Sequence, residues 1–112
     1  RACPSSWYAV GMSAMILHGR LPAKPDKRDE LLAQLLRAAA LLESDPACRF
    51  YLVGTVADDD EGVHVTELWT SPEAHAASLE REDVRALIRE AMPLIGGAPS
   101  GTRVQAAGGK GL

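Results

Sequence analysis

The stretch Val63 to Leu79, VHVTELWTSPEAHAASL, most constrains the fold because it joins a strand directly to a helix. Successive side chains of a strand point to opposite faces of the sheet. One predicted face carries Val63, Val65, Glu67 and Trp69, and the other carries His64, Thr66, Leu68 and Thr70. Ser71 can then cap a helix that begins with Pro72. A strand therefore ends and a helix begins within a few residues.

This stretch also predicts a pocket. Glu67 and Trp69 share one strand face, and His75 follows in the first turns of the helix, near the point where the strand ends. A carboxylate, an indole and an imidazole that titrates near neutral pH are thereby brought together. We take these residues as the candidate site.

The rest of the chain supplies the other elements of a small α+β fold. Alternating and helical apolar patterns predict strands at 14–21, 48–57 and 102–107, and helices at 27–43 and 72–92 with a bend near 80–83. Asp26 is the expected cap of the first helix, and 58–62 is the expected hairpin turn. The resulting order is the ferredoxin-like split βαβ, a four-stranded antiparallel sheet with two helices on one face.

Composition excludes several classes of function. The 112 residues carry a net charge of −3, so no basic surface favours nucleic acid or anionic membranes. The apolar runs are too short to cross a bilayer, and we expect a cytoplasmic protein. Cys3 and Cys48 form neither a disulfide framework nor a metal-ligand pair, and Cys48 is expected to be buried. Residues 1–11 are expected to be a disordered leader or tag before a single domain at 12–112.

Several motifs in order resemble the antibiotic biosynthesis monooxygenase family, including its quinol monooxygenase members. They are Glu67-Leu68-Trp69, then Ser71-Pro72-Glu73-Ala74-His75, then Ala91-Met92-Pro93-Leu94. The segments AKPDKRDELL and DPACRFYLV also resemble the family's entry to the first helix and its second strand. The resemblance covers Met15 to about Val104.

The resemblance implies a homodimer in which two sheets form an α/β barrel. It also implies oxygenation of a small aromatic substrate by dioxygen without flavin, haem or metal. Trp69 matches a family tryptophan, Arg89 falls where the family has an arginine, His75 occupies a tyrosine position and Val65 an asparagine position. The valine at position 65, in place of asparagine, indicates that this protein holds its substrate differently from the polyketide-tailoring members.

These matches give each candidate residue a role. A quinol or polycyclic phenol that loses its proton becomes electron-rich enough to reduce dioxygen. Trp69 would stack on the ring, His75 would accept the proton and Arg89 would stabilise the resulting anion. We expect Glu67 to orient a neighbouring group or pair across the dimer, and His18 to contribute from the first strand.

Three alternatives remain open. They are a haem-binding or haem-degrading relative, an isomerase of small phosphorylated sugars, and a non-catalytic dimeric ligand-binding module. The haem hypothesis expects a histidine on the second helix, and residues 80–92 contain none.

The predicted homodimer is also supported by apolar residues on the sheet face that the helices leave uncovered. These residues are Phe50 or Tyr51, Leu52 or Val53, and Val63.

Overall fold

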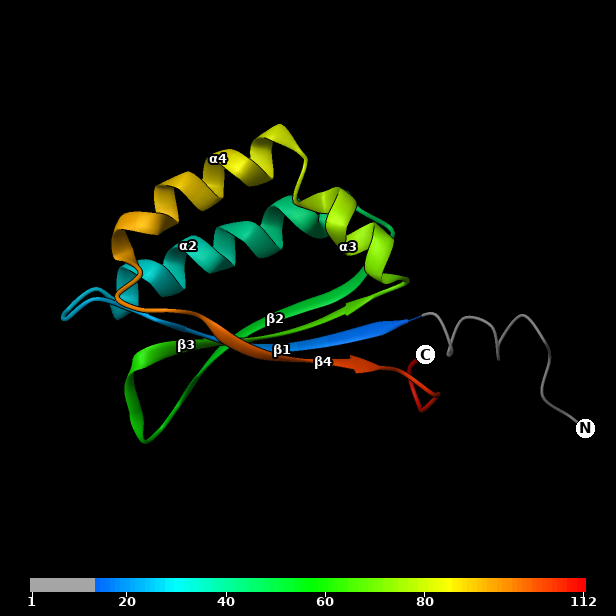
Figure 1. The fold of residues 1–112 in the computed structure, drawn as a ribbon, viewed down its shortest axis with the longest axis horizontal. Helices are drawn as coiled ribbons and strands as arrows, with labels where there is room; N and C mark the ends of the chain where they lie inside the picture. The colour runs from blue at the N-terminus through cyan, green and yellow to red at the C-terminus, as the bar shows by residue number, and fades with distance from the viewer. Residues whose placement is uncertain (1–13) are drawn as a thin grey trace, which may run out of the picture.

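The computed structural model describes residues 14–112, and the expected leader lies outside them. Four strands form one antiparallel sheet in the order β2-β3-β1-β4. The strands are β1 (Met15–Pro22), β2 (Cys48–Val56), β3 (Asp59–Trp69) and β4 (Ser100–Gln105), and the α-helices are α2 (Arg28–Leu41), α3 (Pro72–Ser78) and α4 (Glu82–Ala91). Short 3₁₀ turns follow α2 and α4, at Leu42–Ser44 and Met92–Leu94. The helices cover one face of the sheet (Figure 1). The predicted ferredoxin-like fold is confirmed.

The main core forms where α2 packs against the centre of the sheet. Leu31 and Leu35 of α2 meet Val63 and Val65 of β3, and all four are buried. The leucines recur at helical spacing and the valines at strand spacing, so each element presents one apolar side. The helix-side face of β3 predicted from alternation is confirmed.

The start of α2 differs from the prediction. Asp26 does not cap the helix, since its backbone has φ of 65°, in the left-handed region. Lys27 is the N-cap residue instead, without a side-chain hydrogen bond. Asp is among the residues that tolerate this conformation, so Asp26 makes the turn into the helix rather than capping it.

The hairpin between β2 and β3 is tighter than expected. Val56 pairs with Asp59, which leaves only Ala57 and Asp58 in the turn. Asp59 is held in the strand by Arg20, whose guanidinium donates to both carboxylate oxygens at 2.6 and 2.7 Å, and by His64 at 2.8 Å. These bonds, above all those from the distant Arg20, explain why an acidic sequence typical of a turn continues the strand.

Two smaller predictions were also inaccurate. The last strand begins at Ser100 rather than Thr102 and ends at Gln105. Cys48 is only partly buried, beside the cluster formed by Met15, Leu42 and Trp69.

The helix-free face of the sheet is partly apolar. Phe50, Leu52 and Val104 are 42%, 59% and 37% exposed there. Tyr51 and Val53 point to the helix side and pack against the main core. Val63 was expected on the helix-free surface, but it is 0% exposed and belongs to the core. Within residues 14–112, none of the helices is both long and apolar enough to cross a membrane.

Candidate active site

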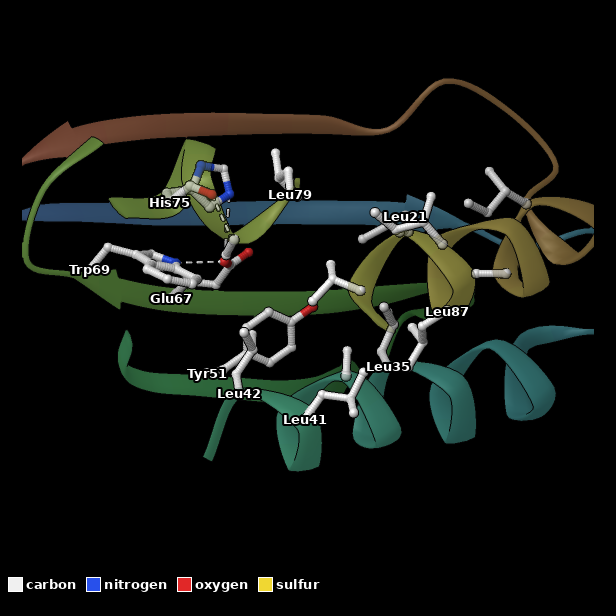
Figure 2. Close-up of a pocket in the computed structure, with 16 residues that line it drawn as sticks. Leu21, Leu35, Leu41, Leu42, Tyr51, Glu67, Trp69, His75, Leu79 and Leu87 are labelled. Carbon is white, nitrogen blue, oxygen red and sulfur yellow. Dashed lines mark hydrogen bonds and ion pairs between the residues drawn. The ribbon is translucent and has the colours of Figure 1, made fainter. Parts of the chain in front are cut away.

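A cavity of about 150 Å³ lies between the sheet and the helices. Its walls are mostly leucine, isoleucine and alanine side chains, while Tyr51, Glu67, His75 and Ser78 bring polar atoms to it (Figure 2). Leu79 and Ile88 also line it, and because they are 42% and 40% exposed they mark where the cavity reaches the surface. A small apolar cavity with few polar groups is the usual form of a ligand site.

Glu67 and Trp69 are linked at the end of β3. The indole Nε1 of Trp69 donates a hydrogen bond of 2.8 Å to Oε1 of Glu67. Both residues are buried, with 1% of Trp69 and 7% of Glu67 exposed. Burial raises the pKa of the Glu67 carboxyl, and the hydrogen bond from Trp69 partly opposes that rise. The carboxyl therefore fixes the indole and keeps a more basic character than a surface glutamate.

His75 reaches the same place from α3. The hydroxyl of Ser71 accepts a hydrogen bond of 3.1 Å from the Ala74 amide, so the predicted N-cap is confirmed. The cap starts α3 beside the end of β3, and the imidazole then lies edge-on to Trp69, with ring centroids 5.3 Å apart. The structure thus brings Glu67, Trp69 and His75 together, as the sequence predicted.

The imidazole is disposed to remain neutral. Burial lowers the pKa of His75, and the positive charge of Arg103 lowers it further. Nε2 of His75 lies 3.9 Å from Oε1 of Glu67, beyond hydrogen-bonding distance, so both groups can contact a third partner. A neutral imidazole beside a carboxyl can accept a proton from a ligand hydroxyl.

Two residues of this region were not predicted as site residues from the sequence. Tyr51 lines the cavity from β2, and Arg103 of β4 acts on His75 through its charge. Across the sheet, Tyr51 of β2 pairs with Glu67 of β3, and Glu67 pairs with Leu17 of β1. Leu17 then pairs with Arg103 of β4. The strand register was the missing signal, because paired residues share a sheet face.

The other predicted site residues lie elsewhere. Arg89 is on the outer side of α4, where its side chain is 63% exposed and lies 3.6 Å from Glu82. His18 is on the helix-free face, 3.3 Å from the Thr66 hydroxyl. Val65 is on the helix side but is buried in the main core rather than lining this cavity.

The sequence pattern of the antibiotic biosynthesis monooxygenase family matches residues 14–90. The chain belongs to this family. The match includes β1, α2, β2, β3, α3 and most of α4, and therefore includes Glu67, Trp69 and His75. Membership supports a monooxygenase-like role for the protein.

Solved structures agree with this assignment. A protein from Chloroflexus aurantiacus assigned to the same family shares 35% identity, with a TM-score of 0.79, over 88% of this chain and 98% of its own. SnoaB of Streptomyces nogalater, a cofactor-independent oxygenase solved as a point mutant, has a TM-score of 0.74 at 14% identity, over 89% of this chain and 99% of its own. At that lower identity the likeness concerns the fold. No curated protein matches the chain.

Metal-ligating side chains are scattered over the part of the chain that the structure describes. Among residues 14–112, no group of three or more histidine, cysteine, aspartate or glutamate side chains is placed to hold a metal ion.

Proposed function

We propose that this protein is a cofactor-independent monooxygenase that oxidises a quinol or a related phenol with dioxygen. The observation that carries the proposal is the apolar cavity in which a buried indole, a carboxyl and an imidazole of lowered pKa meet. Family membership supports the oxygenase class, and the chemistry of the cavity supports the substrate class.

The first step is removal of a phenolic proton. The substrate ring lies against Trp69, and its hydroxyl faces the space between His75 and Glu67. His75 accepts the proton because it enters the step as neutral imidazole. The imidazolium that forms is then stabilised by the neighbouring Glu67 carboxyl.

The phenolate then reacts with dioxygen. It passes one electron to dioxygen, and the radical pair combines to form a carbon–oxygen bond. For a quinol the overall change is quinol plus O₂ to hydroxyquinone plus water: one oxygen atom joins the ring and the other leaves as water. The apolar walls exclude water from the radicals.

Oxygen uptake with a panel of dihydroquinones tests this function. We expect uptake above the uncatalysed rate with the native protein, and none above it in a Trp69→Phe, His75→Ala double variant. Arg85→Gln is a suitable control because Arg85 is exposed on α4 and lies 3.8 Å from Glu80. Ligand binding without oxygen uptake would instead indicate a non-catalytic binding module.

The role expected for Arg89 is tested separately with Arg89→Gln. Because the side chain is 63% exposed and paired with Glu82, we expect uptake to remain within about twofold of the native rate. A loss of tenfold or more would show that Arg89 takes part in the reaction.

We also propose that the protein is a homodimer. Phe50, Leu52 and Val104 lie exposed on a sheet face that no helix covers. Pairing of two such faces would bury these side chains, which supports the barrel expected from the family resemblance.

A further inference from the structure

We propose that Tyr51 is a second anchor of this cavity, and that the site therefore selects a single aromatic ring with hydroxyls at opposite positions, a 1,4-diol. One hydroxyl faces Glu67 and His75, and the other bonds to the hydroxyl of Tyr51. This inference rests on the proposed function for its site, and it narrows the substrate to one-ring quinols.

The first observation is the state of the Tyr51 hydroxyl. Tyr51 lines the cavity, and within residues 14–112 its hydroxyl makes no hydrogen bond and keeps some accessible surface. A hydroxyl that is accessible and unpaired in a largely apolar cavity is free to bond to a ligand. A ligand hydroxyl in the cavity would supply the missing partner.

The second observation is the ionisation state of this group. Burial raises the pKa of Tyr51, and the negative charge of Glu67 raises it further. The phenol is therefore protonated at neutral pH and offers a donor to the ligand, while Glu67 and neutral His75 offer acceptors. The cavity therefore offers a ligand polar groups of two chemically different kinds.

The third observation is the separation of these polar groups. Tyr51 and Glu67 start from paired positions on β2 and β3, but the tyrosine ring extends along the cavity and carries its hydroxyl away from the Glu67 carboxyl (Figure 2). The rest of the cavity wall is mostly apolar, with side chains such as Leu42, Leu87 and Ile88. A flat apolar ring with one hydroxyl at each end matches this pattern.

The fourth observation is size. A protein cavity of about 150 Å³ lined by apolar side chains accommodates benzene. This cavity has about that volume, so it holds one ring. A fused second or third ring would have to extend through the opening at Leu79 and Ile88 or displace side chains of α3 or α4.

Binding measured under nitrogen tests the proposal without turnover. Calorimetry is carried out with phenol, 1,2-, 1,3- and 1,4-dihydroxybenzene and 1,4-dihydroxynaphthalene. We expect the 1,4-diol to bind about fivefold more tightly than phenol, the factor that corresponds to a net hydrogen bond of about 1 kcal/mol. The 1,2- and 1,3-diols and the two-ring diol should bind more weakly than the 1,4-diol.

Tyr51→Phe removes only the unpartnered hydroxyl, and it should bind phenol and the 1,4-diol equally well. Ser78→Ala is the matched control, because it also deletes one hydroxyl from the cavity wall. The Ser78 hydroxyl already donates to the His75 carbonyl at 2.6 Å, so the preference for the 1,4-diol should persist in that variant.

The proposal is overturned if the native protein does not prefer the 1,4-diol, if Tyr51→Phe retains the preference, or if the two-ring diol binds as tightly. These outcomes are independent of oxygen uptake. A protein that prefers the 1,4-diol but consumes no oxygen would overturn the proposed function and leave the role of Tyr51 standing.

Discussion

Among single residues, Glu67 connects the most features of the cavity. Its carboxyl accepts the indole hydrogen of Trp69, lies 3.9 Å from His75 and is 7% exposed. The sequence predicted its face but favoured a supporting role for it. The structure adds that the group is buried beside an imidazole, so its ionisation affects both stability and chemistry.

Glu67→Gln should change how stability depends on pH. The folded pKa of Glu67 is raised above the ordinary value of 4.5, so the folded protein binds this proton more tightly than the unfolded chain. The contribution of Glu67 to native stability is therefore fully present below pH 4.5 and is lost as the pH rises through the folded pKa. Glutamine keeps an acceptor for Trp69 and cannot ionise. The free energy of unfolding, measured with urea, should fall less between pH 4.5 and pH 8 in the variant than in the native protein. Equal falls in the two proteins would contradict a raised pKa for Glu67.

His75→Gln should remove the acidic limb of the activity profile. The pKa of His75 lies below 6.5, so native kcat/KM should be level at pH 7 and fall in more acidic solution. The variant should lose about 100-fold at pH 7, the lower range for a general base, and the fall with acid should disappear. His64→Gln is the control, since His64 pairs with Asp59. An unchanged acidic limb in His75→Gln would exclude His75 as the base.

At the level of elements, the short helix α3 decides where His75 lies. It spans only Pro72–Ser78, and a helix of this length is marginal without tertiary support. The Ser71 cap and the edge contact with Trp69 supply that support.

Ser71→Ala should reduce the free energy of unfolding by about 1 kcal/mol, the usual cost of losing an N-cap. Urea unfolding measures the change, and Ser71→Asp should restore most of it because aspartate is also a good N-cap. Ser44→Ala serves as a control, since the Ser44 hydroxyl is exposed and makes only a 3.4 Å contact with the Leu41 carbonyl. Equal losses in the two alanine variants would contradict a specific role for the cap.

The elements also show which predictions a sequence supports. Helix and strand order followed from periodicity, and the Ser71 cap followed from local chemistry. The hairpin turn was misplaced because Asp59 is held by Arg20, a partner 39 positions away that local patterns do not reveal. Arg89 was assigned by family position, although Leu87 and Ala91 already define the buried side of α4 and place position 89 opposite. Tyr51 and Arg103 required the register between strands.

For the whole molecule, the two faces of the sheet have different neighbours. The helix side holds the core and the cavity, whereas the opposite face combines exposed apolar residues with the pair of Arg20 and Asp59. Gly62 makes room for that pair, since a side chain there would meet the guanidinium and the carboxylate. This mixture of apolar and paired charged groups is typical of an interface between subunits.

Leu52→Asp should separate the proposed dimer. Leu52 is 59% exposed on the helix-free face, midway along the edge strand β2, so a charge there should prevent pairing with little effect on the fold of each subunit. Sedimentation velocity at micromolar concentration should give a dimer for the native protein and a monomer for the variant. Leu36→Asp is the control, since Leu36 is 53% exposed on α2. A native protein that sediments as a monomer would contradict the dimer.

The edge contact between Trp69 and His75 also gives the cavity an optical signal. The sequence contains two tryptophans, so a Trp7→Phe background leaves Trp69 as the only indole emitter. An imidazolium 5.3 Å from an indole quenches its fluorescence, whereas a neutral imidazole does so weakly. In the protein without substrate, emission from Trp69 therefore follows protonation of His75, so a pH titration of the fluorescence measures the pKa of that imidazole.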